Sequence, residues 1–392
     1  MMTSKARFQT VLNGQIPDRL PVTLFIQDSG HFLNQLYPDI DPWDFETLQL
    51  KVIELQKQLG VDVFVRMLFC TDDSWHWMFG GVDIDHQTDT WQIETTEHPK
   101  DEKTVLKRSK ITTPGGVLTQ EISIHEGQKG TWMMACTEKP IKTPADLQIA
   151  MQYEPRMPAD WPKRAAARIN RIKQALGDDG ILGTWSPHGP YNMISLLIDH
   201  SELYSLFLTD PGYYKQLMEF AIDRTVDYLR AIDAAGVDVH CIGGNVAGGF
   251  LGEKFFTEHI LPFEKRYMDI VQENGTPGCY HNCGEIMNLL EAYKQLGVQW
   301  VEPFSPHPLG DADLAKAKQI VNGAYVMTGG VDQVNVLQKG TVDQVKTVTE
   351  AAIKTGKPDG KFILQSADFL EYGTPIENVQ AYVNTAMQFA DY

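Results

Sequence analysis

The stretch LGVDVF (residues 59–64) decides the fold, because the chain repeats its pattern three more times. In each copy a segment of helical character ends in Gly and a short apolar run follows at once. The other copies are AGVDVHC (235–241), NGTPGCY (274–280) and LGVQWVE (296–302). Stacking successive βα units onto one parallel sheet requires this arrangement, with Gly turning the chain at the end of each helix.

Apolar runs separated by amphipathic segments complete this βα rhythm. The runs span residues 20–26, 61–67, 180–185, 237–244, 276–283, 298–304, 324–330 and 361–366. Eight parallel strands with helices between them predict an α/β fold, a (β/α)8 TIM barrel. A doubly wound open sheet is the competing arrangement, but no G-x-G-x-x-G follows the first run.

Residues 68–158 interrupt the rhythm. Segments such as WQIETTEH and GGVLTQEISIHEG alternate in polarity and are separated by turn residues, which is typical of antiparallel strands. We expect a β-rich insertion here, after the second strand and over the mouth of the barrel. The whole chain, 1–392, is then one barrel domain that contains this insertion.

Composition excludes several classes of partner. The 392 residues carry a formal net charge of −17, which argues against nucleic acid or an anionic membrane surface, because both would repel it. The longest apolar runs, five to eight residues, are too short to span a membrane, and no signal-peptide core is visible. The five cysteines lack paired spacing and do not indicate a disulfide framework. We therefore expect a cytoplasmic protein, with a homodimer among the oligomeric states left open.

Functional side chains of a parallel barrel lie at the C-terminal ends of its strands. The polar and ionisable residues that follow the predicted strands are therefore candidates for the site. They are Asp28, His31, Arg66, His188, Tyr191, Asn192, Asn245, His281, Cys283, Glu302 and Asp368. In the segment TWSPHGPYNM (184–193), His188, Tyr191 and Asn192 could contact a substrate, or its two prolines could merely shape a loop against the core.

An aromatic cluster lies in DDSWHWMFG (72–80), which contains Trp75, Trp77, Met78 and Phe79. It could form an apolar lid over a flat ligand. Large apolar side chains are more often buried in the core, so a strand packed on the barrel is the alternative. Trp77 is a candidate substrate contact.

The segment CYHNCGE (279–285) is the most informative for chemistry. His281 and Cys283 are two residues apart on an extended stretch, so their side chains leave the same face. An imidazole and a thiolate together suit Zn²⁺, and the Gly that follows lets the backbone bend sharply. Core packing or a substrate-contacting histidine remains the alternative, since H-x-C alone is a short pattern.

HNCG (281–284) resembles the H-x-C-G zinc motif of corrinoid-linked methyltransferases in the uroporphyrinogen decarboxylase superfamily. RLPV (19–22), LGVD (59–62), GGVDQVNVLQKGT (329–341) and TPIENVQAYV (374–383) are also similar to that superfamily. The similarity spans nearly the whole chain, but only HNCG is specific to chemistry. The resemblance implies a TIM barrel with a zinc site and a corrinoid carried on a partner protein.

Two departures from the family pattern bear on function. The decarboxylase itself has an Arg-rich N-terminal loop that binds porphyrinogen carboxylates, whereas the matching stretch here, FIQDSGHFLNQLYPD (25–39), contains no Arg. That difference argues against porphyrin decarboxylation. The zinc methyltransferases supply a third ligand, a Cys, after the eighth strand, where this chain has Ala367. Asp368 and Glu302 are the oxygen donors best placed to complete a metal site.

The resemblance therefore implies a zinc-dependent methyltransferase of the O-demethylase type, which moves a methyl group from a small methylated compound to a corrinoid protein. An aryl methyl ether is the preferred donor, because an aromatic-rich mouth and an incomplete thiolate set suit an oxygen substrate. We expect His281, Cys283 and Asp368 to hold the metal. Catalytic roles are expected for Asp28, His188 and Glu302, and substrate contacts for His31, Arg66, Trp77, Tyr191, Asn192 and Asn245.

Two alternatives remain at this point. One is a metal-free lyase, similar to the decarboxylase, acting on a porphyrinogen or another small acid, with Asp28 and His281 touching the substrate directly. The other is a non-catalytic corrinoid-binding subunit whose metal site has decayed.

Overall fold

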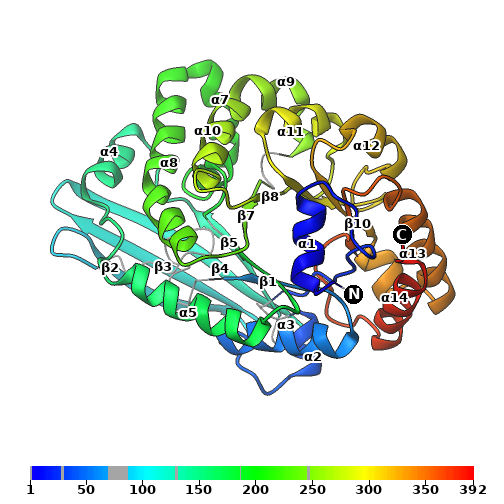
Figure 1. The fold of residues 1–392 in the computed structure, drawn as a ribbon. Helices are drawn as coiled ribbons and strands as arrows, with labels where there is room; N and C mark the ends of the chain where they lie inside the picture. The colour runs from blue at the N-terminus through cyan, green and yellow to red at the C-terminus, as the bar shows by residue number, and fades with distance from the viewer. Residues whose placement is uncertain (1, 28–30, 69–86, 129–130, 186, 245–247) are drawn as a thin grey trace.

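A computed structural model describes residues 2–27, 31–68, 87–128, 131–185, 187–244 and 248–392. Seven parallel strands form one sheet in the order β1-β6-β7-β8-β9-β10-β11, curled into a half-barrel (Figure 1). The strands are β1 (Val63–Met67), β6 (Gly180–Trp185), β7 (Val239–Gly243), β8 (Gly278–His281), β9 (Trp300–Phe304), β10 (Val326–Val331) and β11 (Phe362–Ser366). The predicted α/β class with a parallel sheet is confirmed.

Helices alternate with these strands and lie mainly on the outer side of the sheet (Figure 1). They are α1 (Ser4–Leu12), α2 (Phe32–Leu36), α3 (Phe45–Leu59), α4 (Pro144–Tyr153), α5 (Trp161–Leu176), α6 (Pro190–Ser195), α7 (His200–Thr209), α8 (Pro211–Ala234), α9 (Glu253–Phe255), α10 (Leu261–Val271), α11 (Leu290–Leu296), α12 (Leu314–Val321), α13 (Val342–Gly356) and α14 (Ile376–Phe389). No helix in the described ranges is long and apolar enough to cross a membrane.

The first predicted strand, residues 20–26, is not a strand in the structure. Its backbone makes a single parallel bridge to β11, between Val22 and Leu364. On its other side, toward β1, the Asp62 N–H donates to the Val22 carbonyl at 2.8 Å, and beyond that bond the fully buried side chain of Gln56 takes the place of backbone partners. The Gln56 amide nitrogen donates to the carbonyls of Leu24 and Phe64, at 3.3 and 3.2 Å, and its oxygen accepts from the Phe64 N–H at 3.0 Å. An inserted side chain therefore joins the segment to β1.

The interior of the half-barrel is layered along its axis. At the N-terminal end of the strands, Phe8 of α1 lies against an apolar layer that includes Phe64 and Trp300, whose rings stack 4.8 Å apart. Toward the C-terminal ends of the strands, the inward-facing residues become polar, and the pocket opens beyond them. Helix α1 thus closes one end of the barrel, which leaves the C-terminal ends of the strands for a site.

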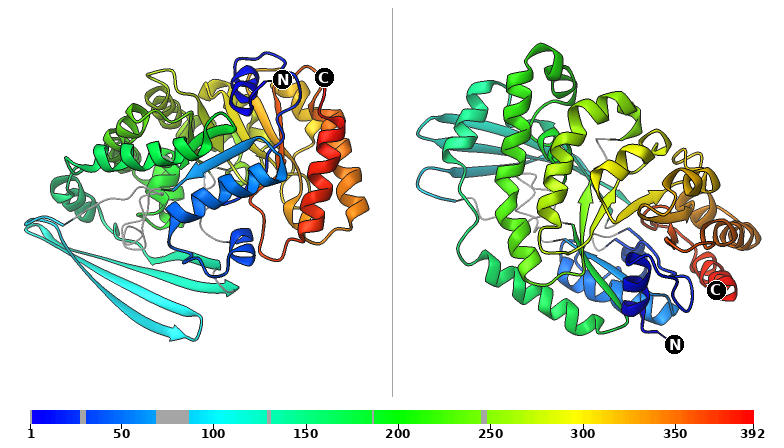
Figure 2. Two further views of the ribbon diagram at one scale, coloured as in Figure 1. Left: turned by 60° about the horizontal axis from the view of Figure 1, so that its bottom comes forward. Right: turned by 45° about the horizontal axis from the view of Figure 1, so that its top comes forward.

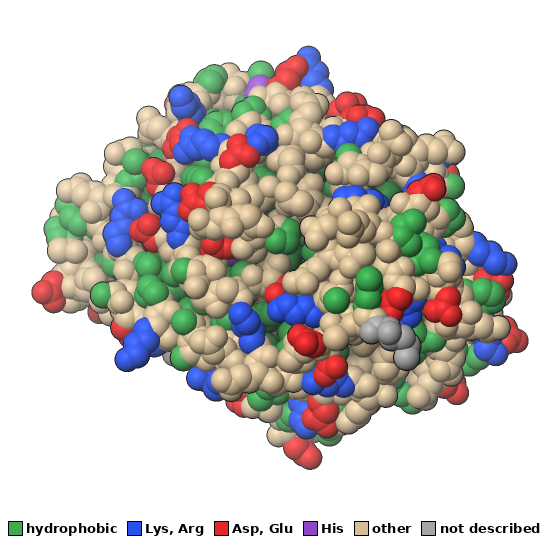
Figure 3. All heavy atoms as spheres, in the orientation of Figure 1, with side chains coloured by type: hydrophobic (Ala, Val, Ile, Leu, Met, Phe, Trp, Pro, Cys, Tyr) green, Lys and Arg blue, Asp and Glu red, His purple; other side chains and the backbone are tan. Residues whose placement is uncertain are grey.

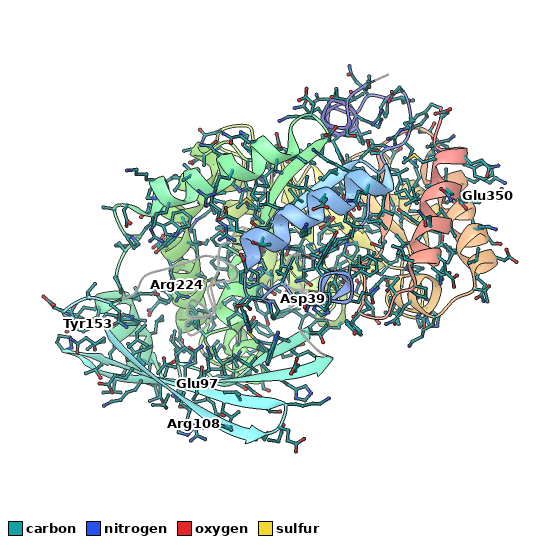
Figure 4. All side chains as sticks on the ribbon, turned by 90° about the horizontal axis from the view of Figure 1, so that it is seen from below. Asp39, Glu97, Arg108, Tyr153, Arg224 and Glu350 are labelled. Atoms are coloured by element: carbon teal, nitrogen blue, oxygen red, sulfur yellow. The ribbon has the colours of Figure 1, made fainter. Side chains whose placement is uncertain are left out.

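A second sheet lies within the range 68–158 and is antiparallel, in the order β2-β3-β4-β5. Its strands are β2 (Gln92–Asp101), β3 (Thr104–Thr113), β4 (Gly116–Gln128) and β5 (Thr131–Glu138). The sheet projects away from the barrel (Figure 2), and Figure 4 shows Glu97 and Arg108 on its far part. The same range also contains helix α4, which begins with a capping box at Thr143.

Candidate metal centre

Three different donor atoms meet where β8 and β11 end. The Nε2 atom of His281 lies 2.9 Å from the Sγ atom of Cys283, and that sulfur lies 3.0 Å from Oδ2 of Asp368. One ligand atom from each residue lies within 4.8 Å of the other two. The predicted metal ligands are therefore brought together.

Local backbone geometry places these side chains. β8 ends at His281, and Gly284 then turns the chain with a φ of 86°, in the left-handed region that glycine adopts without strain. On the other side β11 ends at Ser366, and the following backbone N–H of Phe369 donates to Oδ1 of Asp368 at 2.7 Å. That bond holds the carboxylate with its other oxygen toward Cys283.

Glu302, which is buried beneath the pocket, sets the orientation of the His281 ring. Burial alone would raise the pKa of Glu302, but the adjacent Arg66 charge and the His281 hydrogen bond lower it to about 2. An ionised Glu302 can only accept, so the Nδ1 atom of His281, 3.2 Å away, donates the proton. Nε2 is then left with its lone pair facing Cys283, as a metal ligand requires.

The donor set fits a divalent cation. Burial, with a further contribution from the Asp368 carboxylate, raises the pKa of the Cys283 thiol well above its ordinary value. A divalent cation at this point would reverse that effect, because its charge offsets one thiolate and one carboxylate together. Nitrogen, sulfur and oxygen donors are all ordinary ligands of Zn²⁺, and three protein ligands leave one position open.

A pocket with a volume of about 280 Å³ lies directly above these three residues. His281, Cys283 and Asp368 belong to its lining, and six of the remaining lining residues are Phe or Trp. The rings come from Phe25, Trp43, Phe45, Trp132, Trp185 and Phe369. Trp185 and Phe25 present their edges or faces to the His281 ring, with centroids 5.2 and 5.8 Å away.

Two further predicted residues line the pocket. Burial, with a smaller contribution from His281, lowers the pKa of His188 to about 4, so its imidazole is neutral near pH 7. Nδ1 of His188 lies so close to Gly243 that a Cβ there would come within 2.1 Å of it. His31 lies beside Phe369, with ring centroids 4.5 Å apart.

Other predicted residues lie elsewhere. Arg66 and Glu302 are buried beneath the pocket, where two guanidinium nitrogens of Arg66 reach the Glu302 carboxylate at 2.5 and 3.2 Å. Tyr191 and Asn192 are buried in α6 and are not among the pocket-lining residues, a location that favours the packing alternative. Asp28, Trp77 and Asn245 lie outside the described residues.

Several residues in the pocket wall and in the buried network beneath it were not predicted from the sequence. Gln365 completes the buried network by accepting from Arg66 at 3.0 Å, and its place on the inward face of β11 could have identified it. Trp43 and Trp132 come from segments far apart in the chain, yet their rings lie 5.9 Å apart. Only the position of the antiparallel sheet brings them together, and no local pattern encodes that position.

Known proteins with similar sequences fall into two groups. A methylated-thiol–coenzyme M methyltransferase of Methanosarcina mazei is 25% identical over 181 residues, which cover 46% of this chain and 46% of that protein. A methylcobamide:CoM methyltransferase (MtbA) of the same organism is 26% identical over 202 residues, 51% of this chain and 56% of that protein. A uroporphyrinogen decarboxylase of Corynebacterium efficiens is 25% identical over 187 residues, 44% and 50% respectively. The chain spans about half the length of these relatives.

Fold and family comparisons cover more of the chain. A solved structure of a methyltransferase from Methanosarcina mazei superposes with a TM-score of 0.70 at 19% identity, over 99% of both chains, and this likeness shows the fold. The sequence model described as uroporphyrinogen decarboxylase (URO-D) matches residues 105–389, which is most of the chain. The chain therefore belongs to the uroporphyrinogen decarboxylase (URO-D) family.

Proposed function

We propose that this protein is a zinc-dependent methyltransferase that takes a methyl group from an aryl methyl ether and passes it to a corrinoid on a partner protein. The observation that carries the proposal is the meeting of His281, Cys283 and Asp368 at the floor of an aromatic pocket. Two relatives support methyl transfer, since one is named for methylcobamide and both for coenzyme M.

In this proposal His281, Cys283 and Asp368 hold the ion. When bound, Zn²⁺ supplies Lewis acidity toward the ether oxygen of the donor. In the net reaction the O–CH₃ bond breaks with its electron pair remaining on oxygen, which takes up a proton. The methyl group goes to the two-electron reduced corrinoid, so the products are a phenol and a methylated corrinoid.

The chain's own side chains prepare the pocket for this reaction. Glu302, held by Arg66, keeps the His281 proton on Nδ1. His188 is neutral, so an imidazole N–H that faces the pocket can donate a hydrogen bond to a substrate oxygen. The aromatic walls exclude water, which strengthens every electrostatic interaction inside.

We further propose that residues 1–392 act as one barrel domain with the antiparallel sheet inserted after β1. In this arrangement the sheet forms one wall of the site, because Trp132 and Met134 of β5 line the pocket. The wall and the three ligands come from the same chain, so the site needs no second subunit, and a homodimer would leave it unchanged.

The test combines metal content with turnover. We expect about one zinc ion per purified wild-type chain by inductively coupled plasma mass spectrometry, and loss of zinc in Cys283→Ala and Asp368→Ala. Cys136→Ala is the matched control, since Cys136 is a half-buried cysteine of β5 outside the pocket lining. Zinc-loaded protein should convert cob(I)alamin to methylcobalamin in the presence of methoxybenzene, followed by visible absorption.

The outcomes separate the alternatives. Equal turnover by zinc-free protein would contradict the metal role. Cobalamin binding without any methyl transfer would favour a non-catalytic corrinoid-binding subunit. Release of carbon dioxide from a porphyrinogen or another small acid would favour the lyase, an outcome that the missing arginines of residues 25–39 argue against.

A further inference from the structure

The described residues that line the pocket include no Lys or Arg, and this lack of positive charge bears on the choice of substrate. Resting on the proposed methyl transfer, we propose that the pocket selects uncharged single-ring aryl methyl ethers and excludes their carboxylated analogues. Strand β5 contributes Trp132 and Met134 to the pocket wall, and a substitution there tests this preference.

The size of the pocket limits the ligand to one ring. Its volume, about 280 Å³, lies just below the range of roughly 300–1,000 Å³ usual for drug-sized ligands. Trp43 and Trp132 stand 5.9 Å apart on one side, and Phe25 and Phe369 stand 6.2 Å apart near the metal ligands. Offset and edge contacts at these spacings are the arrangements that aromatic rings prefer. A single ring therefore finds partners on several sides.

The charges around the pocket disfavour an anion. Among the described residues that line it there is no Lys or Arg. The ionisable lining groups are His31, His188, His281, Cys283 and Asp368. Burial lowers the pKa of both His31 and His188, so neither supplies a positive charge near pH 7. The charge of the proposed Zn²⁺ is already balanced by the Cys283 thiolate and the Asp368 carboxylate, so a carboxylate on the ligand would lose its hydration without gaining an unmatched positive charge, which is costly.

Arg66 does not provide that counter-ion, although it lies beneath the pocket. The ring of Phe25, which lines the pocket, covers the guanidinium at 4.1 Å. The charge of Arg66 is already matched by Glu302, which is fully buried. The arginine is thus shielded from a ligand by an aromatic ring and neutralised by its own partner.

A substitution in strand β5 can change the charge of the pocket wall without changing other elements. Trp132 and Met134 line the pocket, whereas Met133 between them is 59% exposed on the other face of the strand. A lysine at position 134 would place a cation at the pocket wall. The same substitution at position 133 adds the same charge to the same strand but outside the pocket.

The experiment measures binding to the zinc-loaded protein by calorimetry at pH 7, so that it does not depend on turnover. The three probes are methoxybenzene, 4-methoxybenzoate and 4-methoxybenzamide, the last matching the benzoate in size without its charge. We expect the amide to bind about as well as methoxybenzene, and the benzoate to bind at least about tenfold more weakly. Met134→Lys should reduce the preference for the amide over the benzoate by about tenfold, and Met133→Lys should leave it unchanged.

Several results would overturn the proposal. Equal binding of amide and benzoate to the wild-type protein would do so without any variant, and would decide the matter even if Met134→Lys did not fold. Weak binding of both would mean that size, not charge, excludes the benzoate. Tighter binding of a 4-methoxyphenyl-trimethylammonium probe than of methoxybenzene would show a cation site instead. Binding of methoxybenzene without methyl transfer would leave this inference standing while the proposed function fails.

Discussion

Glu302 is the residue on which the candidate metal ligands depend most closely. Its Oε1 atom is shared between Arg66 Nε and His281 Nδ1, and its Oε2 atom accepts from a second guanidinium nitrogen. A carboxylate can accept all three bonds, but an amide has only one oxygen. In Glu302→Gln the new NH₂ group must therefore face a donor: at the Oε2 position it costs Arg66 one bond, and at the Oε1 position it removes the acceptor of both Arg66 Nε and His281.

We expect Glu302→Gln to weaken zinc binding by about 10–100-fold, the usual effect of changing a group that orients a metal-ligating histidine. Competition with a chromophoric chelator would measure the affinity, and circular dichroism would show that the variant is folded. Glu291→Gln, at an exposed position in α11, is the control. Unchanged zinc affinity in a folded Glu302→Gln protein would mean that Glu302 does not position His281.

At this scale the sequence predicts part of the candidate site and misses part. His281 and Cys283 could be placed together because two residues on an extended segment share a face, and Asp368 because strand ends meet at one end of a barrel. These rules could not predict the role of Arg66. Whether an inward arginine reaches a ligand or a buried carboxylate depends on the residue across the barrel, here Glu302 on β9.

Among the elements, seven of the eight predicted strand runs contain or overlap a strand of the parallel sheet, whereas residues 20–26 do not form one and helix continuity is not predicted. The predicted run 180–185 coincides with β6, and the run 361–366 contains β11. The segment 253–275 looks like one amphipathic helix, but the structure divides it into α9, a π-helical stretch at Phe256–Ile260, and α10. Pro262 lacks the N–H of a regular helix and its ring crowds the preceding turn, so a wider turn precedes it.

Helix α10 also holds the loop that carries His188. The hydroxyl of Tyr267 donates to the carbonyl of Pro187 at 2.9 Å, and Oε1 of Glu264 accepts from the Tyr191 N–H at 3.2 Å. Glu264 is fully buried. Burial, only partly offset by the hydrogen bond from the Tyr191 N–H, raises the pKa of Glu264 to about 8 from an ordinary value of 4.5.

The raised pKa of Glu264 predicts that the free energy of unfolding falls as the pH rises. Below pH 4.5 Glu264 is protonated in both the folded and the unfolded chain, so it adds no pH dependence. Between pH 4.5 and 8 the unfolded chain releases this proton and the folded chain keeps it, so the free energy of unfolding falls by up to about 1.4 kcal/mol per pH unit. Glu264→Gln cannot titrate, so its stability relative to wild type should rise by about 2–4 kcal/mol between pH 5 and pH 8.

Urea denaturation of both proteins at the two pH values would measure this difference. Other titrating groups are common to both proteins and cancel in the comparison. Glu253→Gln, at an exposed position of α9, should show no such trend. A stability difference between Glu264→Gln and wild type that does not vary with pH would show that Glu264 is ionised in the folded protein.

Over the whole molecule, charge is distributed evenly on the face seen in Figure 3, where acidic and basic side chains intermingle. One cluster of buried charge lies where the two ends of the chain meet. The Leu20 N–H donates to the Ala390 carbonyl at 2.9 Å, and the backbones of Arg19 and Asp391 form an isolated antiparallel β-bridge. The segment that fills the space between β11 and β1 is therefore held partly by the C-terminus.

Asp62 is the centre of this closure. It is fully buried just before β1, and its carboxylate accepts from Arg7 of α1, from Arg19 at 2.7 Å and from the Val22 N–H at 2.9 Å. One side chain thus ties the helix that plugs the barrel, the closing segment and the first strand to one another. The sequence shows this aspartate only as part of LGVDVF, and nothing local indicates that two arginines from the N-terminal segment converge on it.

Asp62→Asn should therefore destabilise the molecule far more than removal of an ordinary surface charge. It removes one of the two carboxylates that pair with the buried Arg7, the other being Asp18 at 2.8 Å, so the cost approaches without reaching the roughly 3–5 kcal/mol of breaking a buried pair outright. Asp179→Asn is a matched control, because Asp179 also precedes a strand and pairs with Lys57 at 2.8 Å, but is 63% exposed and should cost less than about 1 kcal/mol. Urea midpoints of the two variants measure the difference. If both fell by the same small amount, the barrel would be held closed by its apolar interior and the backbone bonds to β11, and the convergence of arginines on Asp62 would be incidental to it.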